Sequence, residues 1–387
     1  MKIAVIGGGP GGLYFSLLAK KRNPALDITV YERNPEDATF GFGIALQGNS
    51  WDFLREDDQA CLDDIIAHST LLHGQVITHK DEPIEFRTNR PNAGIERLTL
   101  LRILRKHAEK AGVTVRYNQV IDSLVPYADC DLVVGADGIN SIVRRSHDAE
   151  FGTTERMLTS RMAWYGATRR LEPSHLTFRK TPYGYFWSVG YGHSATHSTF
   201  VGECEAQAWE RSGLAQMSPE EQVAFTEKLF ANELKGARVL SNNSAWKTLP
   251  VIRVKQWSVG NRVLLGDALH SPHPSIGSGT RLSMGDAAAL AECVVRHPGD
   301  VPAALVAYRA EREPVKMKLV VPMERSLEWY ETIGSRADAM TPAQLVFDYM
   351  SRTGRMSLER MQKDAPEFYA KYGQAMQAAA RQATVQV

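Results

Sequence analysis

Three glycines near the N-terminus have the spacing of a phosphate-binding loop. Gly7, Gly9 and Gly12 fit the pattern G-x-G-x-x-G, between an apolar run at residues 3–6 and a helical pattern that continues to Lys21. The first glycine permits a tight turn, the second lets the backbone approach a pyrophosphate, and the third lets the helix pack on the strand. The helix N-terminus offers free N–H groups and a positive dipole end to the phosphate. The pattern therefore predicts a phosphate-bearing ligand.

An acidic residue after the second strand indicates that this ligand is a dinucleotide. Residues 27–33, DITVYER, read as an apolar strand that leads to Glu32, twenty residues after Gly12. A carboxylate placed there can accept hydrogen bonds from a ribose diol. We assign the neighbouring Arg33 to the same site. A chance glycine-rich turn is the alternative, but strand, turn, helix, strand and acid occur here in the expected order.

Two later strand-to-helix junctions each carry an aspartate beside a glycine. Residues 130–145 contain a buried strand followed by Asp137 and Gly138, and residues 261–295 contain a strand, Asp267, a Pro/Gly-rich loop and a long helix of small residues. Each aspartate could instead serve only as a helix cap. No second G-x-G-x-x-G occurs, so a nicotinamide cofactor, if used, is expected to dock transiently.

The three motifs, in this order, resemble the class A flavoprotein aromatic hydroxylases, which are built like para-hydroxybenzoate hydroxylase. The resemblance covers roughly residues 1–330 and implies FAD as the bound cofactor, with NADH or NADPH as a transient co-substrate. The residues that it assigns to FAD are Gly7, Gly9, Gly12, Glu32, Arg97, Asp137, Gly138, Asp267, Pro274, Gly277, Ser278, Gly279 and Thr280.

The resemblance also implies the chemistry. In this family reduced flavin reacts with O2 to form a C4a-hydroperoxide, whose distal oxygen is electrophilic and hydroxylates an aromatic ring. The protein supplies a dry cavity, ring positioning and a few polar contacts. Reduced flavin carries negative charge near N1 and O2, and the N–H groups at a glycine-rich helix start, residues 277–280, suit that charge.

Several stretches resemble a narrower group, the hydroxylase part of salicyloyl-CoA 5-hydroxylase and 2-aminobenzoyl-CoA monooxygenase and the violacein-pathway hydroxylase that acts on an indole. These stretches lie at residues 1–15, 30–43, 131–141, 198–203 and 263–280. The first substrate hypothesis is therefore a 2-hydroxy- or 2-aminobenzoyl-CoA ring, and the second is a tryptophan-derived intermediate. The CoA-thioester enzymes are usually fused to an old-yellow-enzyme-like domain, so a reductase or CoA-ligase step is expected from a separate protein or not at all.

Two other functions stay open at this point. One is an FAD-dependent reductase of the prenyl-reductase type, and the other is a non-catalytic flavin-binding regulator.

The chain departs from the thioester enzymes at residues 188–190, at residues 273–275 and at Arg281, where the substrate pocket is expected. The substrate therefore cannot be copied from these relatives.

Five residues are candidates for substrate contact or catalysis. His273 is the candidate for a polar contact to the ring substituent or the flavin, with a structural histidine as an equal alternative. Trp164, Tyr185 and Trp187 could stack on an aromatic ring, although aromatic strand residues are more often core. Arg281 could meet a carboxylate or a CoA phosphate, or be an ordinary surface arginine.

Composition sets limits on partners and location. The chain has 387 residues, 43% of them hydrophobic and 23% charged, with a net charge of +1. No general electrostatic attraction to nucleic acid or anionic membrane is expected from this balance. The cysteines, at positions 61, 130, 204 and 293, lack metal-ligand spacing. With no apolar run long enough to span a bilayer and a strand that begins at Lys2, we expect a cytoplasmic protein without a metal.

We expect an α/β fold with a Rossmann-like FAD-binding domain, an inserted β-sheet domain and C-terminal helices. The predicted ranges are 1–70, 95–160 and 257–310 for the discontinuous FAD-binding domain, 71–94 and 161–256 for the substrate-binding sheet, and 311–387 for the helices. Strands are expected within 71–89, with a turn at residues 81–83, and within 161–171, 176–192 and 197–205. Ser218 and Glu221 form a capping box that predicts a helix over 218–234.

Overall fold

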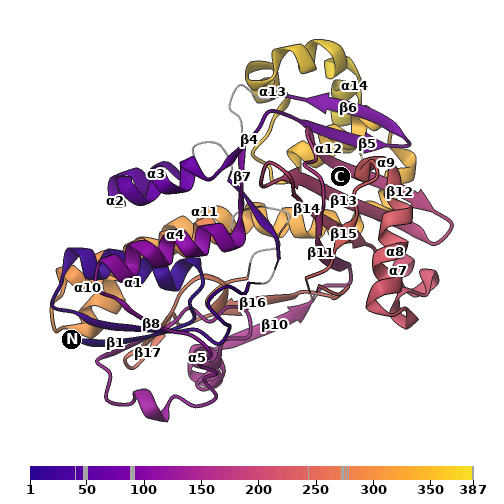
Figure 1. Cartoon of the computed structure of the whole chain (residues 1–387). Coiled ribbons are helices and arrows are strands. Elements are labelled where there is room, and N and C mark those ends of the chain that lie inside the picture. The colour runs from indigo at the N-terminus through magenta and orange to yellow at the C-terminus, as the bar shows by residue number, and fades with distance from the viewer. Residues whose placement is uncertain are drawn as a thin grey trace.

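The computed structural model describes residues 1–39, 41–46, 51–87, 92–242, 244–271, 274, 277 and 279–385, without side-chain detail at 52–53 and 378–385. Within these residues the chain forms two main sheets and a set of helices that connect them (Figure 1). This arrangement confirms the predicted α/β fold class. The assignment of exact domain ranges to cofactor and substrate stays a prediction.

The first sheet has six strands in the order β17-β18-β9-β1-β2-β8. All neighbours in it are parallel except β17 and β18. The strands are β1 (Lys2–Ile6), β2 (Asp27–Tyr31), β8 (Thr114–Arg116), β9 (Leu132–Gly135), β17 (Ser258–Val259) and β18 (Arg262–Leu264). The central strands β1 and β9 are nearly continuous apolar runs, as expected for strands buried on both faces.

Helices cover this sheet. Those named here are α1 (Pro10–Arg22), α4 (Arg97–Lys110) and α10 (Gly279–Arg296), and they lie together above the strands (Figure 1). Helix α1 passes close to α10, because a Cβ on Gly11 would fall nearer than 3.0 Å to Ser283 Oγ and to Leu265 Cδ1. The short helices α5 (Ile142–Arg145) and α6 (Asp148–Phe151) follow β9.

The second sheet has seven strands in the order β15-β11-β14-β13-β12-β5-β6. Its neighbours are antiparallel except β5 and β12. The strands are β5 (Gln75–His79), β6 (Glu82–Phe86), β11 (Arg161–Ala167), β12 (Ser174–Thr181), β13 (Gly184–Gly192), β14 (Ser198–Cys204) and β15 (Val239–Leu240). The four stretches expected to contain strands therefore do contain them.

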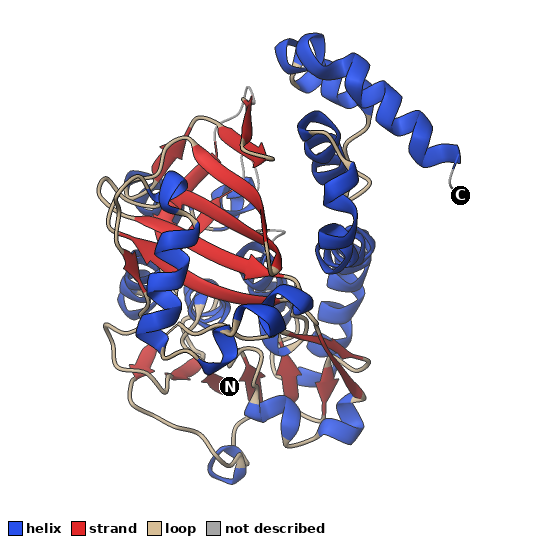
Figure 2. Cartoon of the chain, turned by 90° about the vertical axis from the view of Figure 1, so that its right-hand side faces the viewer, coloured by secondary structure: helices blue, strands red, loops and turns tan. Residues whose placement is uncertain are grey.

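The two faces of the second sheet have different neighbours. One face packs on α7 (Ala206–Ser212), α8 (Pro219–Leu229) and α9 (Ala231–Leu234) through an apolar cluster that includes Tyr165, Phe186 and Phe200. Part of the opposite face packs on helices that follow residue 300, through Phe178, Trp187 and Ile333 among others. Figure 2 shows these C-terminal helices rising beside the sheet.

Helix α11 (Val301–Arg336) joins the two sheets, since its 36 residues span about 54 Å. Near its start, Tyr308 donates a hydrogen bond to the carbonyl of Leu264 in the first sheet. Near its end, Tyr330 and Ile333 pack on the second sheet. Helices α12 (Pro342–Ser351), α13 (Leu358–Asp364) and α14 (Pro366–Val385) then complete the C-terminal part.

Smaller elements fill the junction between the sheets. A three-stranded sheet contains β3 (Gly43–Leu46), β7 (Asn92–Glu96) and β4 (Thr70–Leu72), and a two-stranded one contains β10 (Thr153–Met157) and β16 (Pro250–Val254). Helices α2 (Asp52–Asp57) and α3 (Gln59–Ala67) precede β4. Each helix in the described residues is too short or too polar to cross a membrane.

Two local predictions need correction. The hairpin turn lies at Lys80 and Asp81, both with positive φ, and Glu82 and Pro83 already belong to β6. The helix predicted over 218–234 has the expected capping box, but it ends at Leu229, and α9 forms a separate turn after Phe230. Pro83 is tolerated because β6 is an edge strand.

Candidate functional site

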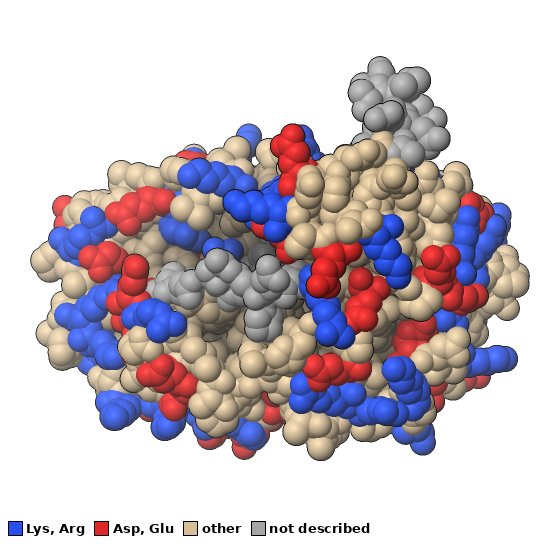
Figure 3. Space-filling model, turned by 90° about the horizontal axis from the view of Figure 1, so that it is seen from above, with Lys and Arg blue, Asp and Glu red and all other residues tan. Residues whose placement is uncertain are grey.

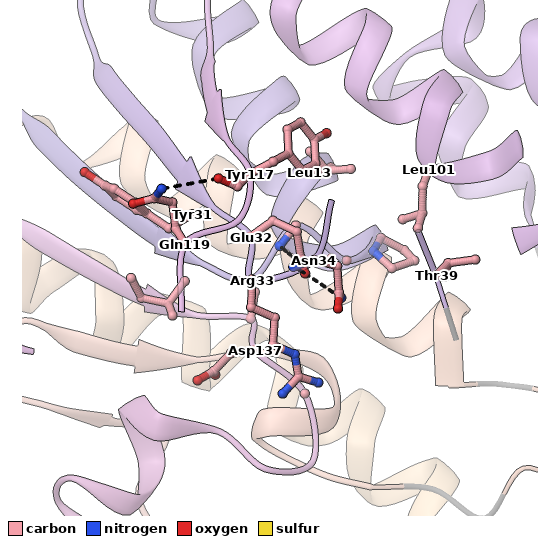
Figure 4. Close-up of a pocket in the computed structure, with 18 of the residues that line it drawn as sticks. Leu13, Tyr31, Glu32, Arg33, Asn34, Thr39, Leu101, Tyr117, Gln119 and Asp137 are labelled. Atoms are coloured by element: carbon pink, nitrogen blue, oxygen red, sulfur yellow. Dashed lines mark hydrogen bonds between the residues drawn. The ribbon is translucent and has the colours of Figure 1, made fainter. Parts of the chain in front are cut away.

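A cavity of about 390 Å³ lies where β1, β2, β9 and β18 end (Figure 4). In an open parallel sheet this is the edge where ligands bind. Its lining includes the predicted cofactor residues Gly7, Gly9, Glu32, Arg33, Arg97, Asp137, Gly138, Asp267, Gly279 and Thr280. The structure thus brings together residues that are up to about 270 positions apart in the sequence.

Each of the three motif glycines is favoured at its position for a different structural reason. Gly7 has φ +108°, and a Cβ there would come closer than 3.0 Å to the carbonyl oxygen of Ala136. A Cβ on Gly12 would collide with the carbonyl oxygen of Gly7, so Gly12 permits the close packing of helix on strand. A Cβ on Gly9 would meet nothing within 4 Å. Gly9 faces open cavity, as required where a phosphate approaches the backbone.

Glu32 directs its carboxylate at the glycine loop. Its Oε2 accepts a hydrogen bond from the N–H of Gly8 at 2.7 Å, and its Oε1 accepts from the backbone N–H and the amide of Asn34 at 2.8 and 2.7 Å. These contacts hold the side chain at the cavity wall (Figure 4). A carboxylate offers about four acceptor positions, so one remains for a ligand hydroxyl.

Asp137 combines the two roles that the sequence left open. Its Oδ2 accepts hydrogen bonds from the N–H groups of Ile142 and Val143 at 2.6 and 3.4 Å, so it caps the start of α5. Its Oδ1 is buried and has no hydrogen-bond partner among the described residues. Burial raises the pKa of this carboxyl, and the Ser141 side chain and the backbone N–H groups oppose the rise. The free oxygen suits a hydrogen-bond donor on a ligand.

A second cavity, of about 340 Å³, separates the start of α10 from the second sheet. One wall contains Pro274, Gly277, Gly279, Thr280, Asp267 and Arg97, and the opposite wall contains Trp164, Val189, Tyr191, Val201 and Glu203. Arg97, Asp267, Gly279 and Thr280 line both cavities. The two spaces are therefore neighbours, and one elongated molecule can extend through both.

Arg97 stands at the boundary of the two cavities, at the first residue of α4. Its Nε donates a hydrogen bond to Thr39 Oγ1 at 3.2 Å. Burial lowers the pKa of this guanidinium, and the carboxylates of Asp267 and Glu32 oppose the change. A half-buried arginine between two carboxylates is held in place and keeps donors for a ligand.

Asp267 is supported from below by a buried ionic cluster that sequence reasoning missed. The N–H of Gly266, which has φ +58°, donates to Asp286 Oδ2 at 3.2 Å. Asp286 also contacts His270 at 2.9 Å and Arg312 at 2.8 Å. Burial alone would raise the pKa of Asp286, but His270 and Arg312 hold it below its ordinary value. The sequence signal for this cluster was Asp286 itself, the one aspartate among the small residues of α10.

The candidate substrate residues are not all at the second cavity. Trp164 lines it, and its indole N–H has no partner among the described residues. Tyr185 and Trp187 share a strand face with the cavity residues Val189 and Tyr191, but they lie farther along β13, in the core beneath the C-terminal helices. The alternative of plain core packing therefore describes Tyr185 and Trp187, and neither lines the cavity.

Three further candidates have other outcomes. Arg281 is exposed on the far side of α10, in a different depression that also contains Arg22, Asp57 and Arg312, so it does not reach the second cavity. His273 and Ser278 lie outside the described residues. The described residues contain no group of His, Cys, Asp or Glu able to hold a metal ion.

Glu203 lines the second cavity and was not among the sequence candidates. It lies on β14 with 3% of its surface exposed, and Trp187 Nε1 donates a hydrogen bond to its Oε2 at 2.7 Å. The signal in the sequence was a charged residue on the inward side of the strand STFVGEC.

On the outer surface, basic and acidic side chains are interspersed over the face shown in Figure 3.

Comparison with known proteins agrees with this geometry. A family described as "FAD binding domain" matches residues 127–322. The chain is 34% identical to salicyloyl-CoA 5-hydroxylase from Streptomyces sp, over 91% of this chain and 70% of that protein. It is 33% identical to 3-hydroxy-4-methyl-anthranilyl-[aryl-carrier protein] 5-monooxygenase from Streptosporangium sibiricum, over 92% and 95% of the two chains.

A solved structure supports the fold. The chain superimposes on a tetrameric form of 2-methyl-3-hydroxypyridine-5-carboxylic acid oxygenase with a TM-score of 0.69 and 19% identity, over 93% of this chain and 95% of the other. At this identity the match concerns the fold alone. The sequence relatives carry the family assignment: the chain belongs to the FAD-dependent aromatic-ring monooxygenases, the family that its three nucleotide-binding motifs resemble.

Proposed function

We propose that this protein uses NADH or NADPH and O2 to hydroxylate the ring of a 2-hydroxy- or 2-aminobenzoyl thioester. The observation that carries the proposal is the pair of adjoining cavities, one built around the glycine motif and one enclosed by the second sheet. The first suits a dinucleotide, and the second has the size of a small-molecule site.

In this proposal the first cavity holds the ADP part of FAD. Gly7, Gly9 and Gly12 shape the loop at the pyrophosphate, Glu32 and Arg33 serve the adenosine, and Asp137 offers its free oxygen. Asp267, Gly138 and Arg97 continue the site towards the second cavity. The unpartnered oxygen of Asp137 fits a cofactor rich in hydroxyl groups.

The flavin end is proposed to lie at the start of α10. The residues assigned there are Pro274, Gly277, Ser278, Gly279 and Thr280, with His273 beside them. Bound FAD supplies the activation of oxygen for ring hydroxylation. The protein's own contribution is to keep water out with the apolar sheet face and to hold the ring in place between the sheet and this helix start.

Support for a thioester substrate comes from the two relatives, whose names place their aromatic acyl groups on CoA and on an aryl-carrier protein. Both names also describe rings with a hydroxyl or amino group next to the acyl carbon. We propose the same substrate class for this chain, with an acyl-activating ligase as the enzyme that supplies the thioester.

The test follows pyridine nucleotide oxidation by the FAD-loaded protein under ¹⁸O2. We expect 2-hydroxybenzoyl-CoA or 2-aminobenzoyl-CoA to stimulate the oxidation and to gain one ¹⁸O atom. A preference for the free acids would remove the thioester, and turnover of a tryptophan-derived ring instead would support the second substrate hypothesis. A product without label would indicate a reductase. Absence of turnover with any aromatic compound, despite full flavin content, would indicate a regulator.

A further inference from the structure

Glu203 is a buried carboxyl group in a wall that is otherwise mostly apolar. In the sheet register it stands opposite Trp187 of β13 and Met162 of β11. Its side chain shares a strand face with Val201, and both line the second cavity. Burying a carboxylate is costly unless it has hydrogen-bond partners, so the partners of Glu203 decide what it does.

The protein supplies only part of those partners. Trp187 Nε1 donates to Oε2 at 2.7 Å, and within the described part of the chain no donor is found for Oε1. A carboxylate can accept about four hydrogen bonds. Glu203 therefore keeps acceptor capacity, and the space beside it is the cavity itself.

The electrostatic setting favours a neutral donor as the missing partner. Burial raises the pKa of Glu203 to about 7, the hydrogen bond from Trp187 opposes the rise, and the charge of Glu331 adds to it. Above about pH 7 Glu203 is ionised, and negative charge close to it is then unfavourable, so an anionic ligand group would be repelled. A neutral O–H or N–H group can instead donate to the carboxylate.

Two rings of the C-terminal helices frame this position. Tyr330 of α11 and Tyr349 of α12 line the same cavity, and the negative charge of Glu203 helps to raise the pKa of Tyr330. The opposite wall is the start of α10 with Asp267. An aromatic ring that lies between these walls presents one edge to the sheet, where Glu203 is the acidic side chain.

We infer that Glu203 recognises the substrate by accepting a hydrogen bond from the hydroxyl or amino group on the aromatic ring. The inference rests on the proposed function and names one determinant of its substrate class: the ring must carry a neutral O–H or N–H donor on the edge that faces β14. Rings that lack this donor, or that carry a carboxylate there, bind weakly.

The test measures thioester binding to the FAD-loaded protein through changes in the flavin absorption spectrum. The probes are 2-hydroxybenzoyl-CoA and benzoyl-CoA, which differ by one hydroxyl group. At about pH 8.5, above the raised pKa of Glu203, the carboxylate is charged, and we expect the wild type to bind the hydroxylated thioester about tenfold more tightly, since a hydrogen bond to a charged group is worth that much. In Glu203→Gln this preference should fall to about threefold or less.

Trp187→Phe is the matched control, because it removes the indole N–H that donates to Glu203 and leaves the carboxylate at the cavity. The amide oxygen of Glu203→Gln can still accept a hydrogen bond from the indole. If Glu203 only anchors Trp187, Trp187→Phe should therefore lose the preference and Glu203→Gln should keep it, and that result overturns the inference. If Glu203 binds the ring substituent, Trp187→Phe keeps the preference. Equal preference in wild type and Glu203→Gln also overturns the inference.

A failure of the proposed function gives a different result. In that case neither thioester perturbs the flavin spectrum of the wild type, although FAD is bound. The flavin content of each variant, read from the same spectra, shows whether it has folded. Glu203→Asp serves as a second variant, because it keeps the charge in a shorter side chain and should retain an intermediate preference.

Discussion

The Asp286 carboxylate lies 2.9 Å from the His270 imidazole, buried beneath the turn that presents Asp267 to both cavities. The same carboxylate pairs with Arg312 and accepts a hydrogen bond from Gly266. One side chain of α10 thus fixes the turn that follows β18. The cofactor-facing aspartate depends on a second aspartate that never reaches the cavity.

Replacing Asp286 should therefore weaken the fold and the flavin site together. Asp286→Ala leaves the largely buried Arg312 without its anion, which costs up to about 3–5 kcal/mol. We expect a lower midpoint of thermal unfolding and weaker FAD retention during gel filtration. Asp286→Asn keeps the acceptor for Gly266 and should lose less of both. Equal FAD affinity in Asp286→Ala and wild type would contradict this role.

The motif glycines permit a sharper separation of folding from cofactor binding. Gly9 has φ −72° and its Cβ would enter open space, so Gly9→Ala should change the free energy of unfolding of the apoprotein by less than about 0.5 kcal/mol. The added methyl group would, however, occupy the surface proposed for the pyrophosphate. We expect FAD affinity to fall about tenfold or more, measured by the return of flavin fluorescence on dilution.

Gly12→Ala is the matched control for Gly9→Ala. Its methyl group would collide with the carbonyl oxygen of Gly7, so the helix must move away from the strand. Overpacking of this kind costs about 1–3 kcal/mol. Gly12→Ala should therefore destabilise the apoprotein before any cofactor is added. Normal FAD binding by Gly9→Ala would place the pyrophosphate elsewhere.

Trp164 and Tyr185 illustrate what strand periodicity could and could not predict. Both were candidates for ring stacking because aromatic residues alternated along expected strands, and the strands are confirmed. Alternation fixes which face a residue occupies, but not which end of that face stays open. The closed end of this face depends on α11 and α12, which arrive more than a hundred residues later in the chain.

The cofactor edge was more predictable, because each motif sits directly at the end of a parallel strand. Gly7, Glu32, Asp137 and Asp267 therefore had to meet once the strand order was β18-β9-β1-β2. Asp286 and Glu203 escaped prediction for the opposite reason. Their roles depend on contacts between side chains of different elements. A single charged residue in the sequence of a strand or helix does not indicate which residue it will contact.

The different positions of Trp164 and Tyr185 predict different defects. Trp164→Ala enlarges the second cavity and removes one of its aromatic side chains, so the KM for the thioester should rise about tenfold while FAD content is kept. Tyr185→Phe removes the hydrogen bond from the phenol to Asp338, 2.7 Å away, and should cost about 1 kcal/mol of stability without changing KM. Steady-state kinetics and thermal unfolding of both variants check this. A raised KM in Tyr185→Phe alone would reverse the assignment.

The burial of Glu203 also predicts how stability depends on pH. Its pKa rises from an ordinary value of 4.5 to about 7. Between these values the folded protein holds a proton that the unfolded chain has released, so the free energy of unfolding falls as pH rises. Glu203→Gln does not titrate. Its stability relative to wild type should therefore improve by about 2 kcal/mol between about pH 5.5 and about pH 8.

Glu331 provides a control of opposite sign. Burial would raise its pKa, but Glu331 accepts hydrogen bonds from the N–H and hydroxyl groups of Thr159 and from the N–H of Ser160 at 2.7–3.0 Å, and these hold its pKa below the ordinary value. Its contribution to stability is present above the ordinary carboxyl pKa and is lost as pH falls through the lowered one. Glu331→Gln should thus be less stable than wild type at neutral pH, with a difference that shrinks in acid.

The free energies of unfolding of wild type and Glu203→Gln, plotted against pH, decide the matter for Glu203. If the two curves run parallel from about pH 5.5 to about pH 8, Glu203 is ionised throughout at its ordinary pKa, and its carboxylate is not buried as the structure places it.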